Sequence, residues 1–455
     1  MTETHSDVLI LGGGSGGYAC ALRAAQLGLT VTLVEADKVG GTCLHRGCIP
    51  TKALLRAAEV AETASTAASF GVLTEVHGID VNELHAYKNG IVQRLYKGLR
   101  GLLTNDKIRI VEGAGVYSPD RSITVDGVCY TGDSVVLATG SQPRLLDGIE
   151  AGARILTSDQ ALQLDFIPRS AIVLGGGVIG VEFASLWHSF GAEVTIVEAL
   201  PHLLMAEDPW SSTQLTRALR RRGITLRTKT RVAAAKEDDN GVSVELAGGE
   251  TLAADVLLVA VGRIPRSADL AAAGIAVDNG CVVTDDRLCT NVSGVYAVGD
   301  LVAGPQLAHR GFQHGMFVAE EIAGLSPVPV VDHLIPRVVY SHPEVASVGL
   351  TESAAREQYG ACATTVYDLA GNGKSQILRT AGGVKIVRAG EAGPVVGIHM
   401  VGDRIGESIG EAQLAVAWEA LPAEIAAFVH AHPTQNEALG EAMLALAGRP
   451  LHSHA

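Results

Sequence analysis

One arrangement occurs twice in this chain: an apolar strand, a glycine-rich turn, a helical Ala/Leu segment and a second strand followed by an acidic residue. In such a turn the first glycine permits the tight bend, the second lets a pyrophosphate approach the backbone, and the third lets the helix pack closely on the strand. The glycines at this spacing are Gly12, Gly14 and Gly17 in the first copy and Gly175, Gly177 and Gly180 in the second. One such turn is weak evidence, but two with complete surroundings predict two dinucleotide sites in one chain.

The acidic residues that end the two copies are Glu35 and Glu198. An acid at this point accepts hydrogen bonds from a ribose and suits the free 2′-hydroxyl of NAD. Ala199 and Leu200 follow Glu198, so no arginine stands next in the chain to meet the 2′-phosphate of NADP. We therefore expect NAD at the second site. The plainer alternative is that Glu198 is only a solvated charge at a strand end.

The remaining segments predict an α/β chain that ends in an α+β domain without a glycine fingerprint, from about residue 335. Helices are expected over 51–68 and 80–105, and we assign the apolar residues of the second to core packing. Those residues are Leu84, Tyr87, Ile91, Leu95, Leu99 and Leu102. Further strands are expected within 135–138, 242–261 and 295–298.

Cys43 and Cys48 lie between the first glycine-rich copy and the helical segment at 51–68. Five residues of ideal helix rise about 7.5 Å and turn roughly 140°, which sets the two Cα atoms about 8.6 Å apart. A disulfide needs less than about 7 Å, so a bridge requires distorted backbone, which Gly47 tolerates. Pro50 suits the first turn of a helix, whose positive end favours a thiolate. The pair is either a redox-active disulfide at a helix start or two ordinary buried thiols.

Composition narrows the class of protein. The net charge of −14 argues against binding to nucleic acid or to an anionic membrane surface. Seven cysteines, an odd and small number, fit a reducing compartment, where a disulfide is usually catalytic. The polar residues 1–7 resemble neither a signal peptide nor a transit peptide, and no apolar run is long enough to span a membrane. We therefore expect a cytoplasmic protein.

The segment 430–437 reads His-Ala-His-Pro-Thr-Gln-Asn-Glu. Thr434 and Glu437 fit a capping box, so a helix is expected to begin at Thr434. Pro433 favours extended backbone at His432, and the Glu437 carboxylate is placed to orient that imidazole as a base. The plainer interpretation is helix capping by Glu437 beside a satisfied loop histidine. Two histidines without a third ligand nearby do not predict a metal site.

Together these motifs resemble those of the pyridine nucleotide-disulfide oxidoreductases over essentially the whole chain, and most of all the dihydrolipoyl dehydrogenases among them. The matching segments are GGTCLHRGCIPTK at 40–52, VLATGS at 136–141, GGGVIGVEFAS at 175–185, VGRIP at 261–265, VYAVGD at 295–300, LAH at 307–309 and HAHPTQNE at 430–437. The resemblance implies two Rossmann-like domains, for FAD and for NAD, and a C-terminal dimerisation domain. The implied bounds are 1–147 and 268–334 for the two parts of the FAD-binding and central region, 148–267 for the NAD-binding domain and 335–455 for the dimerisation domain.

The resemblance also implies a role for each site residue. Cys43 would exchange with dihydrolipoyl thiols and Cys48 would form a thiolate against the flavin, with Lys52 beside it. His432, oriented by Glu437, would act as the base across the interface of a homodimer. FAD would be held by Gly12, Gly14, Gly17, Glu35, Lys52, Gly115, Thr139, Gly140, Ser141, Asp300 and Ala308, and NAD by Gly175, Gly177, Gly180, Glu182, Glu198 and Gly262.

The implied reaction is the oxidation of protein-bound dihydrolipoyl groups by NAD+, as the E3 component of a 2-oxoacid dehydrogenase complex. The implied partners are a lipoyl domain and the E2 core, or the H-protein of glycine cleavage. A mercuric reductase is disfavoured because the tail 448–455 has no cysteine pair, a glutathione-type reductase because Glu198 suits NAD, and a transhydrogenase because it needs no cysteine pair. A silent FAD-binding module is the alternative from another class.

One departure from the family pattern is His45-Arg46 between the cysteines, where Asn-Val is frequent. The added positive charge either lowers a thiol pKa or alters access to the pair.

Overall fold

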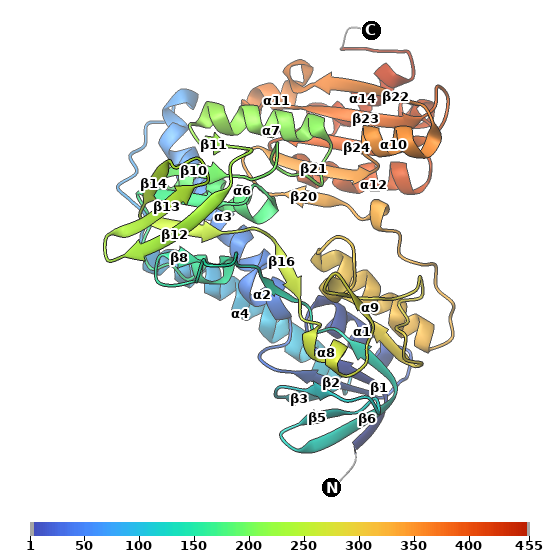
Figure 1. The fold of residues 1–455 in the computed structure, drawn as a ribbon. Coiled ribbons are helices and arrows are strands. Elements are labelled where there is room, and N and C mark those ends of the chain that lie inside the picture. Colours follow the sequence, from blue (N-terminus) through green and yellow to red (C-terminus); the bar gives the residue numbers. More distant parts are fainter. Residues whose placement is uncertain (1–3, 453–455) are drawn as a thin grey trace.

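The computed structural model describes residues 4–452 of the chain. Three units follow one another through the molecule, and the first and last lie at opposite ends (Figure 1). The polar segments 1–7 and 448–455 fall partly outside the described residues. The described part of the first, from Thr4, already belongs to a strand. No described helix is both long and apolar enough to cross a membrane.

The first unit is a seven-stranded sheet with helices against it. Its strands are β1 (Thr4–Leu11), β2 (Val31–Glu35), β3 (Arg109–Glu112), β4 (Val116–Tyr117), β5 (Ile123–Val125), β6 (Val128–Leu137) and β19 (Val295–Ala297). Its helices are α1 (Ser15–Gln26), α2 (Gly41–Arg46), α3 (Cys48–Thr66), α4 (Val81–Asn105) and α9 (Ala308–Ile322). The order is β3-β2-β1-β6-β5-β4, with β19 against β6. The central strands are parallel, and Val8, Leu9 and Ile10 of β1 are fully buried, as expected for a strand covered on both faces.

The second unit repeats the plan with an all-parallel sheet ordered β11-β10-β9-β15-β8. Its strands are β8 (Ile155–Leu156), β9 (Ser170–Leu174), β10 (Glu193–Val197), β11 (Thr225–Arg227) and β15 (Val256–Val259), with helices α5 (Ser158–Ala161), α6 (Val178–Ser189) and α7 (Pro209–Arg222). An antiparallel sheet of β12 (Val232–Asp238), β13 (Gly241–Leu246) and β14 (Thr251–Ala254) completes it, so the strands expected within 242–261 are confirmed by β13, β14 and β15.

Short elements join the first two units. Strands β7 (Ser141–Pro143) and β16 (Arg263–Pro265) pair antiparallel, and they follow β6 of the first sheet and β15 of the second respectively. Helix α8 (Ala268–Ala272) and the pair β17 (Val277–Asp278) and β18 (Cys281–Val282) then lead back to β19 in the first sheet. The chain thus crosses twice between the two units that carry the glycine-rich turns. These crossings bring the carboxyl ends of the parallel strands of both units toward a common space.

The third unit is an antiparallel sheet ordered β20-β21-β24-β23-β22 with helices beside it. Its strands are β20 (Arg337–Val339), β21 (Glu344–Gly349), β22 (Cys362–Asp368), β23 (Gly383–Ala389) and β24 (Val395–Gly402). Its helices are α10 (Glu352–Tyr359), α11 (Gly373–Leu378), α12 (Ile409–Ala417), α13 (Pro422–Ile425) and α14 (Glu437–Leu446). The expected α+β character of this part of the chain is confirmed.

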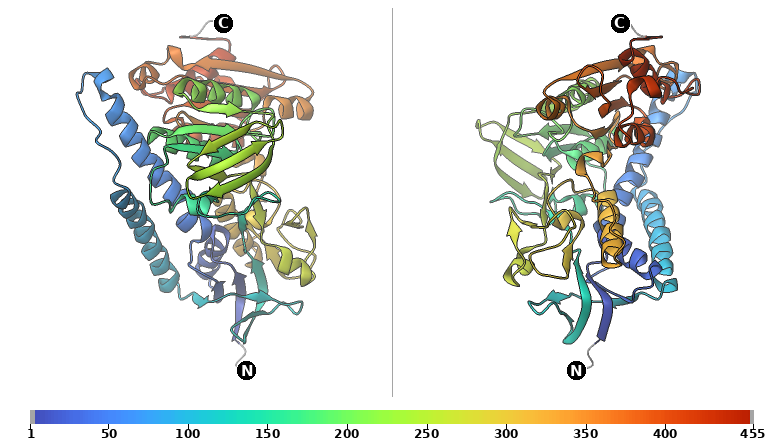
Figure 2. Two further views of the ribbon diagram at one scale, coloured as in Figure 1. Left: turned by 60° about the vertical axis from the view of Figure 1, so that its left-hand side comes forward. Right: turned by 90° about the vertical axis from the view of Figure 1, so that its right-hand side faces the viewer.

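Helices α3 and α4 form a long pair along one side of the molecule (Figure 2). Helix α3 begins in the first unit, and its residues Leu54 and Ala58 belong to the hydrophobic core of the second. This helix therefore carries residues of its first three turns to the junction of the first two units.

Two expectations for these helices were wrong. Helix α3 begins at Cys48 and ends at Thr66, before a 3₁₀ turn, instead of spanning 51–68, because the break falls at Gly47. On α4 only Leu99 of the six apolar residues assigned to core packing is fully buried, whereas Leu102 is 55% exposed. The helix lies on the surface along α3, and its buried stripe is rotated onto Lys88, Val92, Leu99 and Leu103.

Candidate functional site

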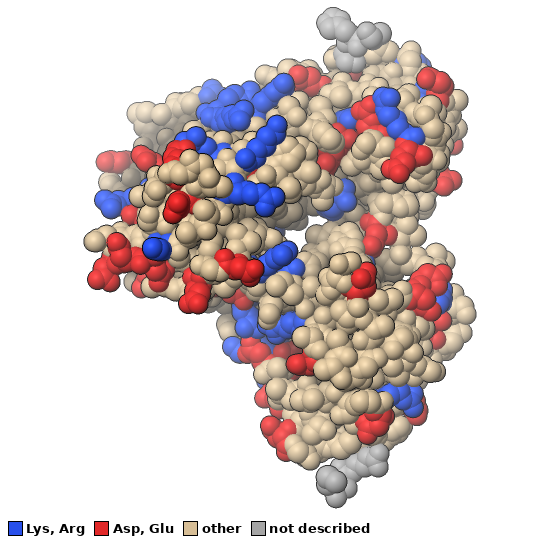
Figure 3. Space-filling view, in the orientation of Figure 1, with Lys and Arg blue, Asp and Glu red and all other residues tan. Residues whose placement is uncertain are grey.

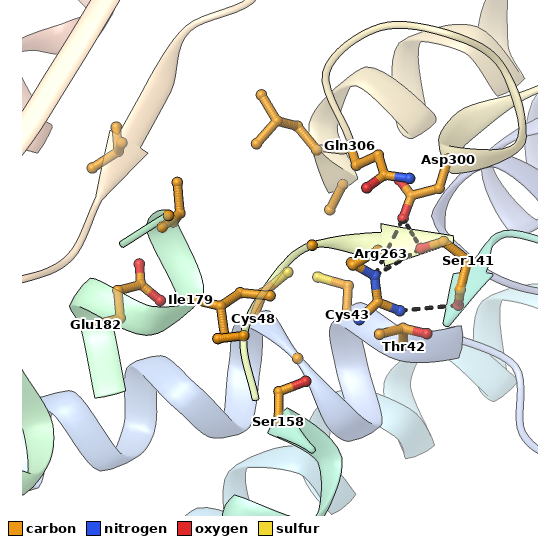
Figure 4. Close-up of a pocket in the computed structure, with 18 of the residues that line it drawn as sticks. Thr42, Cys43, Cys48, Ser141, Ser158, Ile179, Glu182, Arg263, Asp300 and Gln306 are labelled. Atoms are coloured by element: carbon orange, nitrogen blue, oxygen red, sulfur yellow. Dashed lines mark hydrogen bonds and ion pairs between the residues drawn. The ribbon is translucent and has the colours of Figure 1, made fainter. Parts of the chain in front are cut away.

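A cavity of about 1640 Å³ opens where the three units meet, and it is lined by residues of all three. The structure brings most of the predicted site residues to it, as the close-up in Figure 4 shows for several. Those that line it are Gly14, Cys43, Cys48, Lys52, Gly140, Ser141, Gly175, Gly177, Glu182, Glu198, Gly262, Asp300 and Ala308. Those that do not are Gly12, Gly17, Glu35, Gly115, Thr139, Gly180, His432 and Glu437.

The glycine-rich turns have the same geometry in both copies. Gly12 has φ +105° and Gly175 has φ +110°, and a Cβ on either would lie 2.3 Å from the carbonyl oxygen of the neighbouring strand end. No atom lies within 4 Å of a Cβ placed on Gly177, which faces the cavity. The first glycine thus makes the tight bend, and the second leaves open space of the kind a pyrophosphate requires. This cradle fits a dinucleotide in each half of the molecule.

Each strand-end acid ties its own turn together. The Glu35 carboxylate accepts a hydrogen bond from the Gly13 N–H at 2.6 Å, and the Glu198 carboxylate accepts one from the Gly176 N–H at 2.6 Å. Its other oxygen accepts from the Leu200 N–H at 2.7 Å. Glu198 is therefore not merely a solvated charge at a strand end. It organises the turn while lining the cavity.

We expected no arginine near Glu198 because none follows it in the chain. This expectation was wrong, because the fold brings arginine residues close to it from the next strand. Strand β11 runs parallel to β10, so the Glu198 N–H bonds to the Arg227 carbonyl at 2.8 Å. The chain then returns along the cavity, and Arg231 lines it together with Glu198. Figure 3 shows basic side chains gathered on this part of the molecule, over α7 and its neighbours. Reading only the residues that follow Glu198 in sequence misses cations brought by the next strand.

The backbone between the two cysteines is distorted, as the spacing requires. Helix α2 ends at Gly47, whose φ is −144° and ψ −111°, and α3 begins with Cys48. Pro50 lies in the first turn of α3, as expected. Both cysteines are free thiols here, and their sulfur atoms are turned toward one another (Figure 4).

The two thiols have opposite acid–base character. The hydrogen bond that Cys43 donates to Cys48, assisted by the Lys52 charge, lowers the pKa of Cys48 to about 7. The same hydrogen bond, together with burial, raises the pKa of Cys43 above its usual value. Of the reduced pair, Cys48 is therefore the sulfur that ionises near neutral pH, while Cys43 remains a thiol. Thiolate is the form that reacts in disulfide exchange.

Lys52 is held next to this pair by a buried carboxylate. Its Nζ donates to both oxygens of Glu182, at 2.9 and 2.8 Å, and lies 4.8 Å from the centre of the Tyr340 ring. Burial opposes the charged form, but Glu182 raises the pKa of Lys52 above its usual value. Glu182 also accepts from the Tyr340 N–H at 3.0 Å. The lysine is therefore a fixed positive charge beside Cys48.

A second polar group lies across the cavity. Ser141 donates to the Asp300 carboxylate at 2.6 Å and accepts from Arg263 Nε at 2.7 Å (Figure 4). Arg263 also donates to the Ser141 carbonyl at 2.9 Å. Sequence reasoning did not name Arg263 or Tyr340 as site residues. The first had a signal, because it follows a buried strand and Gly262, but nothing in the sequence marks the tyrosine.

His432 and Glu437 form the expected pair, but on the outside of the third unit. His432 Nδ1 lies 2.8 Å from Glu437 Oε1, and the two side chains are 74% and 20% exposed. Helix α14 begins at Glu437 and not at Thr434. The reciprocal bonds between Thr434 and Glu437 are present, at 2.8 and 3.3 Å, but residues 434–436 form a turn before the helix.

His45 and Arg46 each have a partner other than the two sulfurs, and Arg46 also lines the cavity. His45 Nε2 lies 3.0 Å from the Val39 carbonyl oxygen, and its ring packs edge-on against Tyr96. Arg46 pairs with Asp37 at 3.1 Å. Lys52, and not Arg46, is the cation that lowers the pKa of Cys48.

The chain matches known families and structures over nearly its whole length. Residues 6–315 match the family model of pyridine nucleotide-disulphide oxidoreductases, and residues 335–443 match the dimerisation domain of the same family. Dihydrolipoyl dehydrogenase of Bacillus subtilis is 39% identical, with 99% of each chain covered, and dihydrolipoyl dehydrogenase 2, mitochondrial, of Arabidopsis thaliana is 38% identical, covering 98% of this chain and 91% of the relative.

Among solved structures, LpdA from Mycobacterium tuberculosis superposes with a TM-score of 0.88 at 26% identity, covering 97% of this chain and 99% of that one. The HOCl-induced flavoprotein disulfide reductase RclA of Escherichia coli, solved as a Cu(II) complex, gives 0.87 at 27% identity, with the same coverage. The glycine turns, the coupled thiols and these matches agree. The chain belongs to the pyridine nucleotide-disulphide oxidoreductase family.

Proposed function

We propose that this protein oxidises dihydrolipoyl groups to lipoyl disulfides with NAD+ as the acceptor. The observation that carries the proposal is the coupled pair Cys43 and Cys48, of which Cys48 ionises near neutral pH while Cys43 stays a thiol, beside Lys52 in a cavity shared by two dinucleotide cradles. The names of relatives that cover nearly the whole chain support the same reaction.

In the oxidised protein, Cys43 and Cys48 form the disulfide that accepts two electrons. A substrate thiolate attacks Cys43 Sγ, which breaks the bond between the cysteines and leaves Cys48 as a thiolate. The second substrate thiol then attacks the first substrate sulfur, which closes the lipoyl disulfide, and its proton passes to Cys43, which leaves as a thiol. Exchange needs a thiolate attacker, so a base must remove a substrate proton, and His432 with Glu437 is the base–carboxylate pair assigned to this task.

The residues present fit both cofactors. FAD would be held by the first glycine turn, Ser141, Asp300 and Ala308, and NAD by the second turn, Glu198 and Gly262. FAD, when bound, supplies the two-electron relay between the thiols and NAD. Lys52 and Glu182 provide a fixed ion pair at the junction of the two cradles, and Lys52 favours the thiolate that donates electrons.

The protein is assigned as a homodimer on its match to the family's dimerisation domain. His432 lies outside the cavity of its own chain, which supports its acting on the disulfide of a second copy. The partners we assign are a lipoyl domain and the E2 core of a 2-oxoacid dehydrogenase complex, or the H-protein of glycine cleavage. Proposed domain bounds remain 1–147, 148–267, 268–334 and 335–455.

The test is steady-state oxidation of dihydrolipoamide by the flavin-loaded enzyme with NAD+ and with NADP+. We expect NAD+ to be favoured at least about tenfold, because a hydrogen bond to a charged group such as Glu198 contributes roughly 1.5–3 kcal/mol. Arg231 lines the same cavity, so the comparison tests whether this cation outweighs Glu198 and favours NADP+. Turnover only with glutathione or only with NADP+ would overturn the assignment, and an anaerobic NADH titration without a charge-transfer band would favour a silent FAD-binding module.

A further inference from the structure

The exposed imidazole of His432 gains its position from the loop that carries it. Among residues 4–452 its side-chain hydrogen-bond partner is Glu437, at 2.8 Å, and three-quarters of its surface is open. An exposed side chain on a free loop would sample many positions, and a displacement of about 1 Å at a reacting group can cost a factor of 100 in rate. A base that must meet a substrate held elsewhere therefore needs a loop with a fixed shape.

A buried amide fixes the centre of this loop. Asn372, which is 3% exposed and precedes α11, donates from Nδ2 to the Thr434 carbonyl oxygen at 3.0 Å. The Thr434 N–H donates in turn to Glu437 Oε2 at 2.8 Å, and the other oxygen of that carboxylate contacts His432. A continuous chain of hydrogen bonds thus runs from Asn372 through one loop residue to the imidazole.

The next loop residue is held in the same way. Gln435 is 8% exposed, donates from Nε2 to the Asp403 carbonyl oxygen at 2.7 Å and accepts at Oε1 from Ser375 at 2.7 Å. Ser375 is fully buried, and its N–H donates to Asn372 Oδ1 at 2.8 Å. The two amides are therefore linked to each other through α11.

These polar groups do something that apolar packing would not. Burying an amide costs free energy unless its hydrogen bonds are made, so a loop that needed only to be covered would be served by apolar side chains. Here three polar residues lie buried together, and their hydrogen bonds are directional and point at two successive loop residues. Such a network selects one loop conformation over others of similar compactness.

We propose that Asn372 and Gln435 are positioning residues that hold the loop 430–436 in the one conformation that presents His432 as a base. The inference rests on the role given to His432 under the proposed function. It assigns to α11 and the end of β24, which touch neither the thiols nor the cavity, a part in setting the rate of thiol oxidation.

The test uses Asn372→Ala and Gln435→Met in the flavin-loaded enzyme, each alone and combined with His432→Gln. Gln435→Met keeps the side-chain length and removes both hydrogen bonds. The matched control is Gln376→Ala on the same helix, since that amide bonds to the Ala370 carbonyl and not to the loop. The measurements are dihydrolipoamide oxidation over a range of pH, and NADH oxidation by ferricyanide, a reaction that needs no base.

Each positioning variant is expected to lower kcat for dihydrolipoamide about tenfold, while the ferricyanide rate and the control variant stay within about twofold. Because the loss acts through His432, the positioning substitutions should not lower kcat further in the His432→Gln background. A general structural defect would lower kcat in that background as well. A normal kcat in both variants, or a loss that persists in that background, overturns the inference. Normal activity of His432→Gln itself would instead refute the role of the histidine, so the two failures are distinguishable.

Discussion

Two glutamates each pair with a basic side chain, one at the wall of the cavity and the other on the exposed surface. Lys52 and Glu182 meet at 2.8 Å at the cavity wall beside the thiols, and Glu182 is only 3% exposed. His432 and Glu437 meet at the same distance, but His432 is 74% exposed and lies outside the cavity. The distance alone therefore does not distinguish the two pairs, whereas burial and neighbours do.

The contrast separates two tasks. The buried pair acts on a group of its own chain, since the Lys52 charge favours the thiolate of Cys48, which lines the same cavity. The exposed pair has no thiol of its own chain among its hydrogen-bond partners in residues 4–452. The electron-handling half of the site is thus complete within one chain, and the proton-handling half is presented outward, which suits a second copy.

Replacing His432 should produce the largest effect. We expect His432→Gln to slow dihydrolipoamide oxidation at least about a hundredfold, because loss of a general base typically costs 10²–10⁴ in rate. NADH oxidation by ferricyanide should continue at the normal rate, because the buried pair and the cofactor cradles are untouched. Near-normal turnover with dihydrolipoamide would show that His432 and Glu437 take no part in the mechanism. The two pairs could then not be assigned separate tasks.

Replacing Lys52 should produce a smaller effect of another kind. The Cys48 pKa is about 7, lowered by the hydrogen bond from Cys43 and by the Lys52 charge, so the thiolate band of the reduced enzyme should grow as pH rises through about 7. Lys52→Met removes an opposite charge, which should raise that midpoint by roughly one pH unit. The measurement is a pH titration of the charge-transfer absorbance of the reduced enzyme. A midpoint equal to that of the unaltered protein would show that the lysine does not act on the thiolate.

Sequence reasoning reached the glycine turns and the break between the cysteines, because their geometry follows from local chain chemistry, whereas the roles of Lys52 and Glu182, 130 residues apart, came only from the family resemblance. The glycine turns demand positive φ, and the break between Cys43 and Cys48 follows from helix geometry and Gly47. It also paired His432 with Glu437, since the two are five positions apart in one loop.

What sequence reasoning missed depends on neighbours that are distant in the chain. Arg231 reaches the cavity only because β11 pairs with β10. The apolar residues of α4 fit helical spacing, but tertiary packing buries a different face of the helix, the one that contains Lys88. Lys88 Nζ donates to the Leu162 carbonyl oxygen at 2.5 Å. The start of α14 moved to Glu437 because side chains of α11 and its preceding turn hold residues 434 and 435 in a turn.

The smallest effect is expected from replacing His45 and Arg46, which lie between the cysteines. This replacement serves as the control for Lys52→Met. Arg46 is 43% exposed and pairs with a half-exposed carboxylate, Asp37, so its charge is screened by solvent. Exposed pairs of this kind contribute about 0–1 kcal/mol. His45 is held by the Val39 carbonyl and packs against Tyr96.

The variant His45→Asn with Arg46→Val, which gives the residues frequent in the family, should therefore leave the charge-transfer midpoint near pH 7. Its kcat with dihydrolipoamide should change less than about twofold, because the charge that acts on Cys48 comes from Lys52. Both quantities are measured beside Lys52→Met under the same conditions. A midpoint shift as large as that of the lysine variant would mean that a cation paired with a half-exposed carboxylate acts on the thiolate as effectively as one held by the buried Glu182. The buried carboxylate would then not be what makes Lys52 effective.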